Sequence, residues 1–169
     1  MKRLILLRHA KSSWSEDGLP DFERPLSGRG ERDAPRMGAR LRERGIRPDL
    51  VLSSPALRAH RTAKLVGGAL DYANDEIRLD TRLYLATPFE ILAVVVEQAD
   101  AVDSLLVVGH NPGLTDLTNL LAPELDLANL PTAGTVAIDC ATERWAEIRT
   151  AQRRLVYYDY PKNTSTTAD

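Results

Sequence analysis

The stretch Leu4-Ile5-Leu6-Leu7-Arg8-His9 decides the fold, because an unbroken apolar run ends abruptly in two polar side chains. Four consecutive apolar residues are typical of a strand that is buried on both faces. Similar runs occur at residues 51–52 and 105–108, and each ends in polar or turn residues. Helical segments follow these runs at some distance. Strands that alternate with helices indicate an α/β fold on a mostly parallel sheet.

Two further strands are predicted near the C-terminus, at residues 135–138 and 155–158. Together with the earlier strands and the helices between them, they predict a three-layer α/β/α sandwich with a mostly parallel central sheet. In such folds, ligands bind at the carboxyl ends of the strands.

Local signals predict four helices. Ala34, Met37 and Leu41 share one face of the first, and Gly45 stands where a glycine would end it. Pro35 interrupts this segment, which predicts either a position in an early turn or a kink.

The other helices have clearer starting signals. Ser54-Pro55 predicts an N-cap followed by proline at the first helical position, with a helix to Val66. Thr87-Pro88-Phe89-Glu90 is a capping box and predicts a helix to about Gln98. The turn Asn111-Pro112-Gly113 leads into a helix at residues 114–121.

Composition excludes several classes of protein. The chain has 169 residues, of which 43% are hydrophobic and 27% are charged, close to ordinary globular usage. The 22 basic and 24 acidic side chains give a net charge of −2, so broad nucleic-acid binding is disfavoured. The single cysteine, Cys140, excludes an intramolecular disulfide framework and a cysteine zinc finger.

Length and hydropathy bound the organisation of the chain. We expect one domain over residues 1–162 and a polar, disordered tail over residues 163–169. No apolar run reaches the ~18 residues that a membrane helix needs. The short apolar segment near Met1 does not fit a signal peptide. We therefore expect a cytoplasmic protein without a membrane partner, and a monomer by default.

Polar side chains gather where the predicted strands end. Arg8 and His9 follow the first strand, and His110 follows the strand at residues 105–108. Arg58 lies one turn into the helix that follows the strand at residues 51–52. Because the carboxyl ends of parallel strands meet at one edge of a sheet, one crevice would collect these side chains.

This combination suits a phosphate better than a metal ion. Catalytic zinc usually has three protein ligands, and neighbouring arginines would repel it. Guanidinium groups match phosphate oxygens in bidentate geometry, and a helix N-terminus near Ser54 adds amide donors. A neutral imidazole is a competent nucleophile toward phosphorus, and a cationic pocket keeps His9 neutral. The sequence therefore predicts phosphoryl transfer with no metal.

The wider motif pattern resembles the histidine phosphatase (phosphoglycerate mutase-like) superfamily, and within it the SixA-type phosphohistidine phosphatases. The blocks that carry the resemblance appear in order and extend it over nearly the whole chain; they are Arg8-His9-Ala10-Lys11-Ser12-Ser13-Trp14, Asp21-Phe22-Glu23-Arg24-Pro25-Leu26-Ser27, Arg29-Gly30-Glu31-Arg32-Asp33-Ala34, Ser53-Ser54-Pro55-Ala56-Leu57-Arg58-Ala59 and Val108-Gly109-His110-Asn111-Pro112-Gly113.

The resemblance implies roles for five residues. His9 would be the nucleophile, and Arg8 and Arg58 would bind the phosphoryl group. Arg24 matches a further phosphate-binding arginine, and His110 matches a second histidine that contacts the phosphoryl oxygens. The resemblance also implies a phosphoglycerate mutase-like fold and no metal or organic cofactor.

One departure from the superfamily pattern bears on the substrate. Many members that cleave phosphate esters carry a general acid, either a glutamate after the third strand or an aspartate directly after the second histidine. Here the stretch from Asp80 to Leu85 lacks that glutamate, and Asn111 follows His110. An alkoxide needs a proton from such an acid, whereas an imidazole that leaves phosphohistidine needs it much less.

These features favour a phosphatase that acts on phosphohistidine, most directly on a protein, since no long insertion is available to build a lid. Asp21, Glu23 or Glu90 could still supply the acid from outside the motif. The alternatives are a phosphomonoesterase for a small sugar or nucleotide phosphate, or a phosphate-binding module with vestigial activity.

Overall fold

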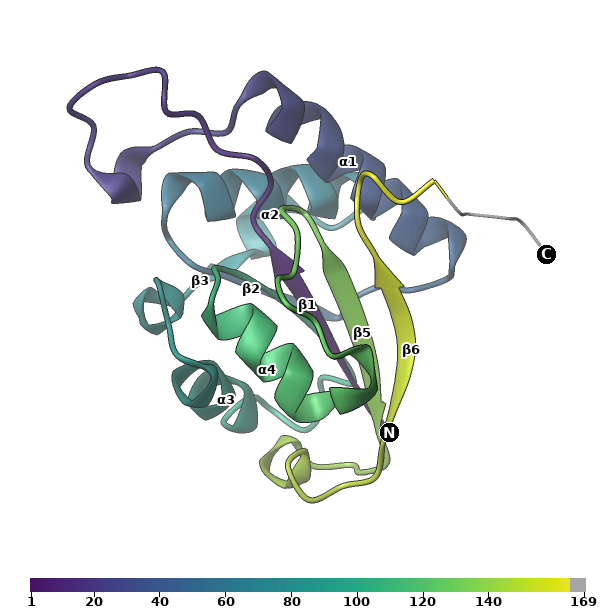
Figure 1. The fold of residues 1–169 in the computed structure, drawn as a ribbon. Helices are drawn as coiled ribbons and strands as arrows, with labels where there is room; N and C mark the ends of the chain where they lie inside the picture. The colour runs from purple at the N-terminus through teal and green to yellow at the C-terminus, as the bar shows by residue number, and fades with distance from the viewer. Residues whose placement is uncertain (165–169) are drawn as a thin grey trace.

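In the computed structural model, which describes residues 1–164, strand β1 (Lys2–Arg8) lies inside a six-stranded sheet of order β3-β2-β4-β1-β5-β6 (Figure 1). The other strands are β2 (Leu50–Ser53), β3 (Arg78–Leu79), β4 (Ser104–Gly109), β5 (Thr135–Cys140) and β6 (Arg153–Asp159). The α-helices of the described part are α1 (Gly28–Glu43), α2 (Leu57–Ala69), α3 (Pro88–Val96) and α4 (Gly113–Leu121).

The sheet is mixed, with its parallel part on one side. Strands β1, β4, β2 and β3 pair in parallel, whereas β5 runs antiparallel to both β1 and β6. The mostly parallel sheet predicted from the sequence is therefore confirmed. The predicted tail at residues 163–169 lies almost entirely outside the described residues.

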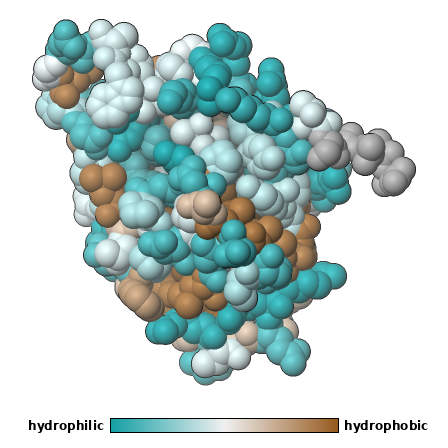
Figure 2. All heavy atoms as spheres, viewed as in Figure 1, coloured by the Kyte–Doolittle hydropathy of each residue, from teal (hydrophilic) through white to brown (hydrophobic). Residues whose placement is uncertain are grey.

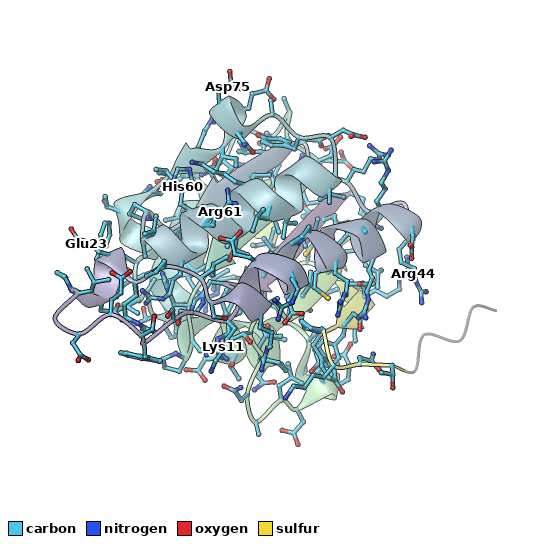
Figure 3. The ribbon with its side chains drawn as sticks, turned by 90° about the horizontal axis from the view of Figure 1, so that it is seen from above. Lys11, Glu23, Arg44, His60, Arg61 and Asp75 are labelled. Atoms are coloured by element: carbon cyan, nitrogen blue, oxygen red, sulfur yellow. The ribbon has the colours of Figure 1, made fainter. Side chains whose placement is uncertain are left out.

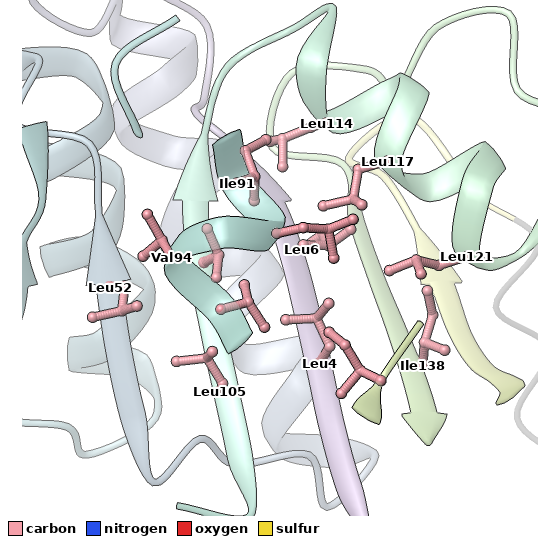
Figure 4. Packing of buried hydrophobic residues seen from close by; sticks show 14 of the residues in the cluster. Leu4, Leu6, Leu52, Ile91, Val94, Leu105, Leu114, Leu117, Leu121 and Ile138 are labelled. Carbon is pink, nitrogen blue, oxygen red and sulfur yellow. The ribbon is translucent and has the colours of Figure 1, made fainter. Parts of the chain in front are cut away.

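Helices cover both faces of the sheet, which confirms the three-layer sandwich. Along β1, Leu4 and Leu6 join the cluster under α3 and α4, while Ile5 and Leu7 join the cluster under α1 and α2. Figure 4 shows Leu4 and Leu6 packed among side chains of α4 such as Leu117. Because successive strand residues point to opposite faces, a strand that is covered twice needs an unbroken apolar run.

Helix α1 begins earlier than its apolar spacing indicates. Ser27 is the N-cap, and its hydroxyl accepts a hydrogen bond of 3.2 Å from the Gly30 amide. Pro35 lies inside this helix, which continues on both sides of the proline. The predicted C-terminal glycine is confirmed, since Gly45 has a φ of +70° and its amide donates to the Arg42 carbonyl.

The start of α2 also differs from the prediction. The helix begins at Leu57 after Ala56, and Ser54 is not its N-cap. The Ser54 hydroxyl instead accepts the Ala56 amide at 3.2 Å. The capping box of α3 is confirmed, because the Thr87 hydroxyl accepts the Glu90 amide at 3.2 Å.

The face of the molecule seen in Figure 2 is mostly hydrophilic, with hydrophobic patches over α3 and α4. Cys140 is buried on β5, and burial raises the pKa of its thiol to about 11. Within residues 1–164, none of the helices is long and apolar enough to cross a membrane.

Candidate active site at the carboxyl edge of the parallel strands

Three neighbouring strands end at the same level of the sheet. Arg8 is the last residue of β1 and pairs with Gly109, the last residue of β4. On the other side of β4, Ser53 ends β2 and pairs with Val108. The residues that follow these ends therefore start from adjacent positions, as the sequence predicts.

The His9 ring is held in one orientation. The His9 amide donates to the Gly109 carbonyl at 3.0 Å, which fixes the backbone beside β4. The ring Nδ1 lies 2.7 Å from the Ala10 carbonyl oxygen. A carbonyl only accepts, so Nδ1 carries the hydrogen and Nε2 keeps its lone pair. This is the tautomer in which Nε2 can attack an electrophile.

His110 lies beside His9, with 5.2 Å between the ring centroids. Its Nε2 is 2.8 Å from the hydroxyl of Ser54. This hydroxyl also accepts the Ala56 amide, and with one hydrogen and a second lone pair it can pair with Nε2 in either tautomer of the neutral ring. Ser54 thus orients the second histidine. The sequence instead predicts that this serine caps the following helix.

The three predicted phosphate-binding arginines come from three elements and are largely buried. Arg8 ends β1, and its Nη1 donates to the Leu130 carbonyl at 3.0 Å. Arg58 lies in the first turn of α2, and only 3% of it is exposed. Arg24 follows the 3₁₀ helix Asp21–Glu23, and the ring of Trp14 stacks 3.2 Å from its guanidinium carbon.

Asp21 connects two of these arginines. Its carboxylate accepts Arg24 Nη1 at 3.0 Å and Arg58 Nη2 at 2.9 Å. Its backbone carbonyl accepts Arg58 Nη1 at 2.7 Å, and the Tyr84 hydroxyl donates to its Oδ2 at 2.5 Å. Tyr84 also packs edge-on against the ring of His110, at 5.5 Å between centroids. The structure thus brings together Arg8, His9, Arg24, Arg58 and His110, and adds Asp21, Tyr84 and Ser54.

The other two candidate acids lie away from this network. Glu23 and Glu90 are exposed, and neither forms an ion pair within the described residues. Figure 3 shows Glu23 on the projecting segment between β1 and α1. His60, on α2, is half-buried and lies outside this network (Figure 3).

Burial and positive charge keep both histidines neutral. Burial is the main reason that the pKa of His9 falls to about 4, and Arg58, Arg8 and Arg24 lower it further. Burial also lowers the pKa of His110 to about 3, with His9 and Arg58 contributing. Both rings are therefore uncharged at neutral pH, as the sequence predicts for His9.

Several buried donors of the site have no partner. Within the described residues, five buried side-chain nitrogen or oxygen atoms lack a hydrogen bond, and three of them are Arg8 Nε, Arg58 Nε and His110 Nδ1. Guanidinium nitrogens only donate, so the unpaired groups of Arg8 and Arg58 are donors. Unsatisfied buried donors are costly, and an anion with several oxygens is the kind of ligand that would satisfy them.

The same arrangement does not suit a cation. In residues 1–164, no group of three or more His, Cys, Asp or Glu side chains is placed to hold a metal ion. The three arginines, the neutral rings and the unpaired donors fit an anion.

Comparison with known proteins agrees with this chemistry. Residues 4–84 match the histidine phosphatase superfamily (branch 1). An uncharacterised protein of Mycobacterium tuberculosis is 33% identical over 165 residues, which cover 92% of this chain and 100% of that protein.

Solved structures extend the comparison to the whole fold. A proposed phosphohistidine phosphatase SixA from Agrobacterium tumefaciens is 29% identical, with a TM-score of 0.80 and coverage of 95% of this chain and 98% of that chain. A mycobacterial glucosyl-3-phosphoglycerate phosphatase shares the fold alone, at 20% identity, a TM-score of 0.68 and coverage of 95% and 99%. The chain therefore belongs to the histidine phosphatase superfamily, as a SixA-like hydrolase of phosphorylated substrates.

Proposed function

We propose that this phosphatase removes phosphate from phosphohistidine on a protein, through a phosphorylated His9 intermediate. The observation that carries the proposal is the orientation of the His9 ring. With Nδ1 bound to the Ala10 carbonyl, Nε2 presents a lone pair among arginine side chains. A neutral, fixed imidazole is the form that attacks phosphorus.

The reaction would proceed in two displacements. His9 Nε2 attacks the phosphorus, and the bond to the leaving group breaks. Arg8, Arg24, Arg58 and His110 donate to the three equatorial oxygens, where charge is spread in the transition state. Water then attacks the phosphorylated His9, which releases inorganic phosphate and restores the neutral ring.

The surroundings of the pocket favour a phosphorus–nitrogen bond over an ester. Asn111, which follows His110, uses its amide nitrogen on Asn129 and Leu130 and its amide oxygen on Thr115. Asp80, at the end of β3, is paired with Arg82, and this hydrogen bond lowers its pKa. Neither position offers a protonated acid for an alkoxide. An imidazole leaving group does not need such an acid, because its ring nitrogen holds the electron pair of the broken phosphorus–nitrogen bond as a stable lone pair.

The rim of the pocket favours a protein substrate. Trp14, which stacks on Arg24, is 72% exposed, and Phe22, which packs against Tyr84, is 41% exposed. Exposed aromatic side chains beside a polar pocket are typical of protein–protein contact. A phosphohistidine on a protein surface would reach the pocket with its neighbours against these rings.

The test is release of phosphate from a phosphohistidine protein and, in parallel, from a panel of sugar and nucleotide phosphates. We expect a higher kcat/KM for phosphohistidine, and no turnover by His9→Ala on either substrate class. Preference for an ester would overturn the proposed substrate and support the small-molecule phosphomonoesterase. Phosphate binding without turnover of any substrate would support a binding module.

A further inference from the structure

Asp21 is the one carboxylate of the described residues that touches the predicted phosphate-binding side chains. It bridges Arg24 and Arg58 through separate oxygens, and Tyr84 donates to the oxygen that faces Arg58. A negative charge at this place competes with a phosphoryl group for the same arginines. A pocket built only to hold phosphate would gain nothing from it.

The carboxylate is held at the site rather than lying there by chance. The Asp21 backbone carbonyl also accepts from Arg58, at 2.7 Å, so the main chain and the side chain clamp the same guanidinium. The Asp21 side chain is nevertheless 41% exposed. One part of Asp21 therefore faces the arginines, and another part faces the solvent at the pocket.

Asp21 retains room for one more donor. A carboxylate offers about four lone-pair sites on its two oxygens. In the described structure, Oδ2 accepts from Arg58 and Tyr84, whereas Oδ1 accepts only from Arg24. A second donor can therefore reach Oδ1 without breaking an existing contact.

The charge state of Asp21 excludes one explanation for its presence. Partial burial would raise its pKa, but the hydrogen bonds from Tyr84, Arg58 and Arg24 outweigh this effect and lower the pKa to about 2. At neutral pH the carboxyl group carries no proton. It is unsuited to the role of general acid, which was one of the possibilities left open by the sequence.

We propose that Asp21 selects substrates whose leaving group is positively charged, by accepting a hydrogen bond from the second ring nitrogen of a phosphorylated imidazole. This inference rests on the proposed function and explains why an anion stands beside the phosphate site. An imidazole carries its two nitrogens on opposite sides of the ring. The nitrogen that is not bonded to phosphorus can thus point toward a carboxylate beside the phosphoryl group.

The chemical step balances without a proton donor. The His9 Nε2 lone pair forms the new phosphorus–nitrogen bond, and the electrons of the old one return to the leaving nitrogen. The proton on the second ring nitrogen stays in place, hydrogen-bonded to Asp21, so the substrate imidazole departs neutral. An alkoxide leaving group has no hydrogen to donate to Asp21. The negative charge of Asp21 also repels any anionic leaving group.

The experiment compares phosphoimidazole with 4-nitrophenyl phosphate, using Asp21→Asn and the wild-type protein. Both leaving groups depart without a general acid, but one leaves from a cationic ring and the other as an anion. We expect kcat/KM for phosphoimidazole to fall roughly 10- to 100-fold, the range of a hydrogen bond to a charged group. The value for 4-nitrophenyl phosphate should stay level or rise, because the competing carboxylate is gone.

Glu23→Gln is the matched control, because it removes the same charge from the same 3₁₀ helix at an exposed position outside the network. It should leave both substrates unchanged. Tungstate affinity, measured by calorimetry, reports whether the pocket of Asp21→Asn is intact. Asp21→Glu keeps a carboxylate, so it should retain most of the preference for phosphoimidazole.

An unchanged ratio of the two kcat/KM values in Asp21→Asn would overturn the inference. If both values also fall equally in Asp21→Glu, Asp21 is only a bridge between arginines. If the wild-type protein hydrolyses neither phosphoimidazole nor a phosphohistidine protein, the proposed function fails and the role of Asp21 fails with it.

Discussion

The two ends of β1 each bury positive charge, but they treat it differently. At the amino end, Lys2 is fully buried, and its Nζ donates to the carbonyls of Asp100 and Val102 and to the carboxylate of Asp103. At the carboxyl end, buried side-chain nitrogens of Arg8, Arg58 and His110 remain unpaired. A buried polar group whose hydrogen bonds are all satisfied stabilises the fold. A buried polar group with unsatisfied hydrogen bonds indicates a place where a ligand can bind. The Lys2 cluster at the amino end of β1 is therefore structural, and the cluster at its carboxyl end is the candidate functional site.

The largest expected effect falls on activity at the carboxyl end. His9→Ala should lower kcat by about 10⁴-fold or more, because no other side chain of the site is placed as the nucleophile. Its free energy of unfolding should change little, since the His9 ring forms only the one short bond to Ala10. Urea denaturation and steady-state kinetics check the two parts. Substantial residual turnover would contradict the comparison.

The next effect falls on stability at the amino end. Lys2→Ala should lower the free energy of unfolding by about 3 kcal/mol, because it removes the hydrogen bonds of a fully buried side chain and leaves a cavity beside Trp145. At temperatures where the variant remains folded, its kcat/KM should match the wild type. Lys162→Ala, at an exposed lysine, should stay within about 0.5 kcal/mol. A loss of kcat/KM in folded Lys2→Ala would contradict the view that the amino end of β1 serves stability alone.

Ligand binding should act on one end only. Phosphate or tungstate at 100 times its Kd should stabilise the wild-type protein by about 2.7 kcal/mol, a rise in Tm of roughly 5–11 °C. Lys2→Ala should show the same rise from a lower starting Tm. Arg58→Ala should show little or none, because it removes donors from the site. Differential scanning fluorimetry over a range of anion concentrations measures all three, and a full shift in Arg58→Ala would count against the proposed site.

The last prediction concerns the acid response. His9 and His110 have pKa values of about 4 and about 3, below the ordinary value of 6.5, so the unfolded chain binds more protons between these limits. Their contribution to stability is complete above about pH 6.5 and is lost as the pH falls toward 4. His9→Ala should therefore lose less stability than the wild type over this interval. A kcat/KM that drops with an apparent pKa near 6.5, measured with a substrate that does not titrate there, would show that His9 is not the buried, neutral base described.

The site residues at the carboxyl ends of the strands were predictable from the sequence. An apolar run predicts a buried strand, and the polar residues after it, such as Arg8 and His110, mark where the strand ends. The antiparallel direction of β5 and β6 was not, because side-chain alternation is the same for both strand directions. Strand β3 was also missed, since Arg78 and Leu79 form a short, exposed edge without an apolar run.

Within the site, the sequence pattern located the arginines and histidines but not their orienting partners. Ser54 looked like a helix cap because proline follows it, and its hydroxyl serves His110 instead. Tyr84 reaches Asp21 from a segment 63 positions along the chain, and no local pattern links the two. Side-chain partners of this kind depend on the packing of distant segments, which spacing along the sequence does not encode.

The position of β1 in the sheet affects how the protein folds during its synthesis. The strand that carries Arg8 and precedes His9 is synthesised before both of its neighbours, β4 and β5, which begin only at Ser104 and Thr135. Pairings between segments so far apart in sequence form slowly and late. We therefore expect a chain that ends before Thr135 to leave β1 without its partner β5 and to lack phosphatase activity.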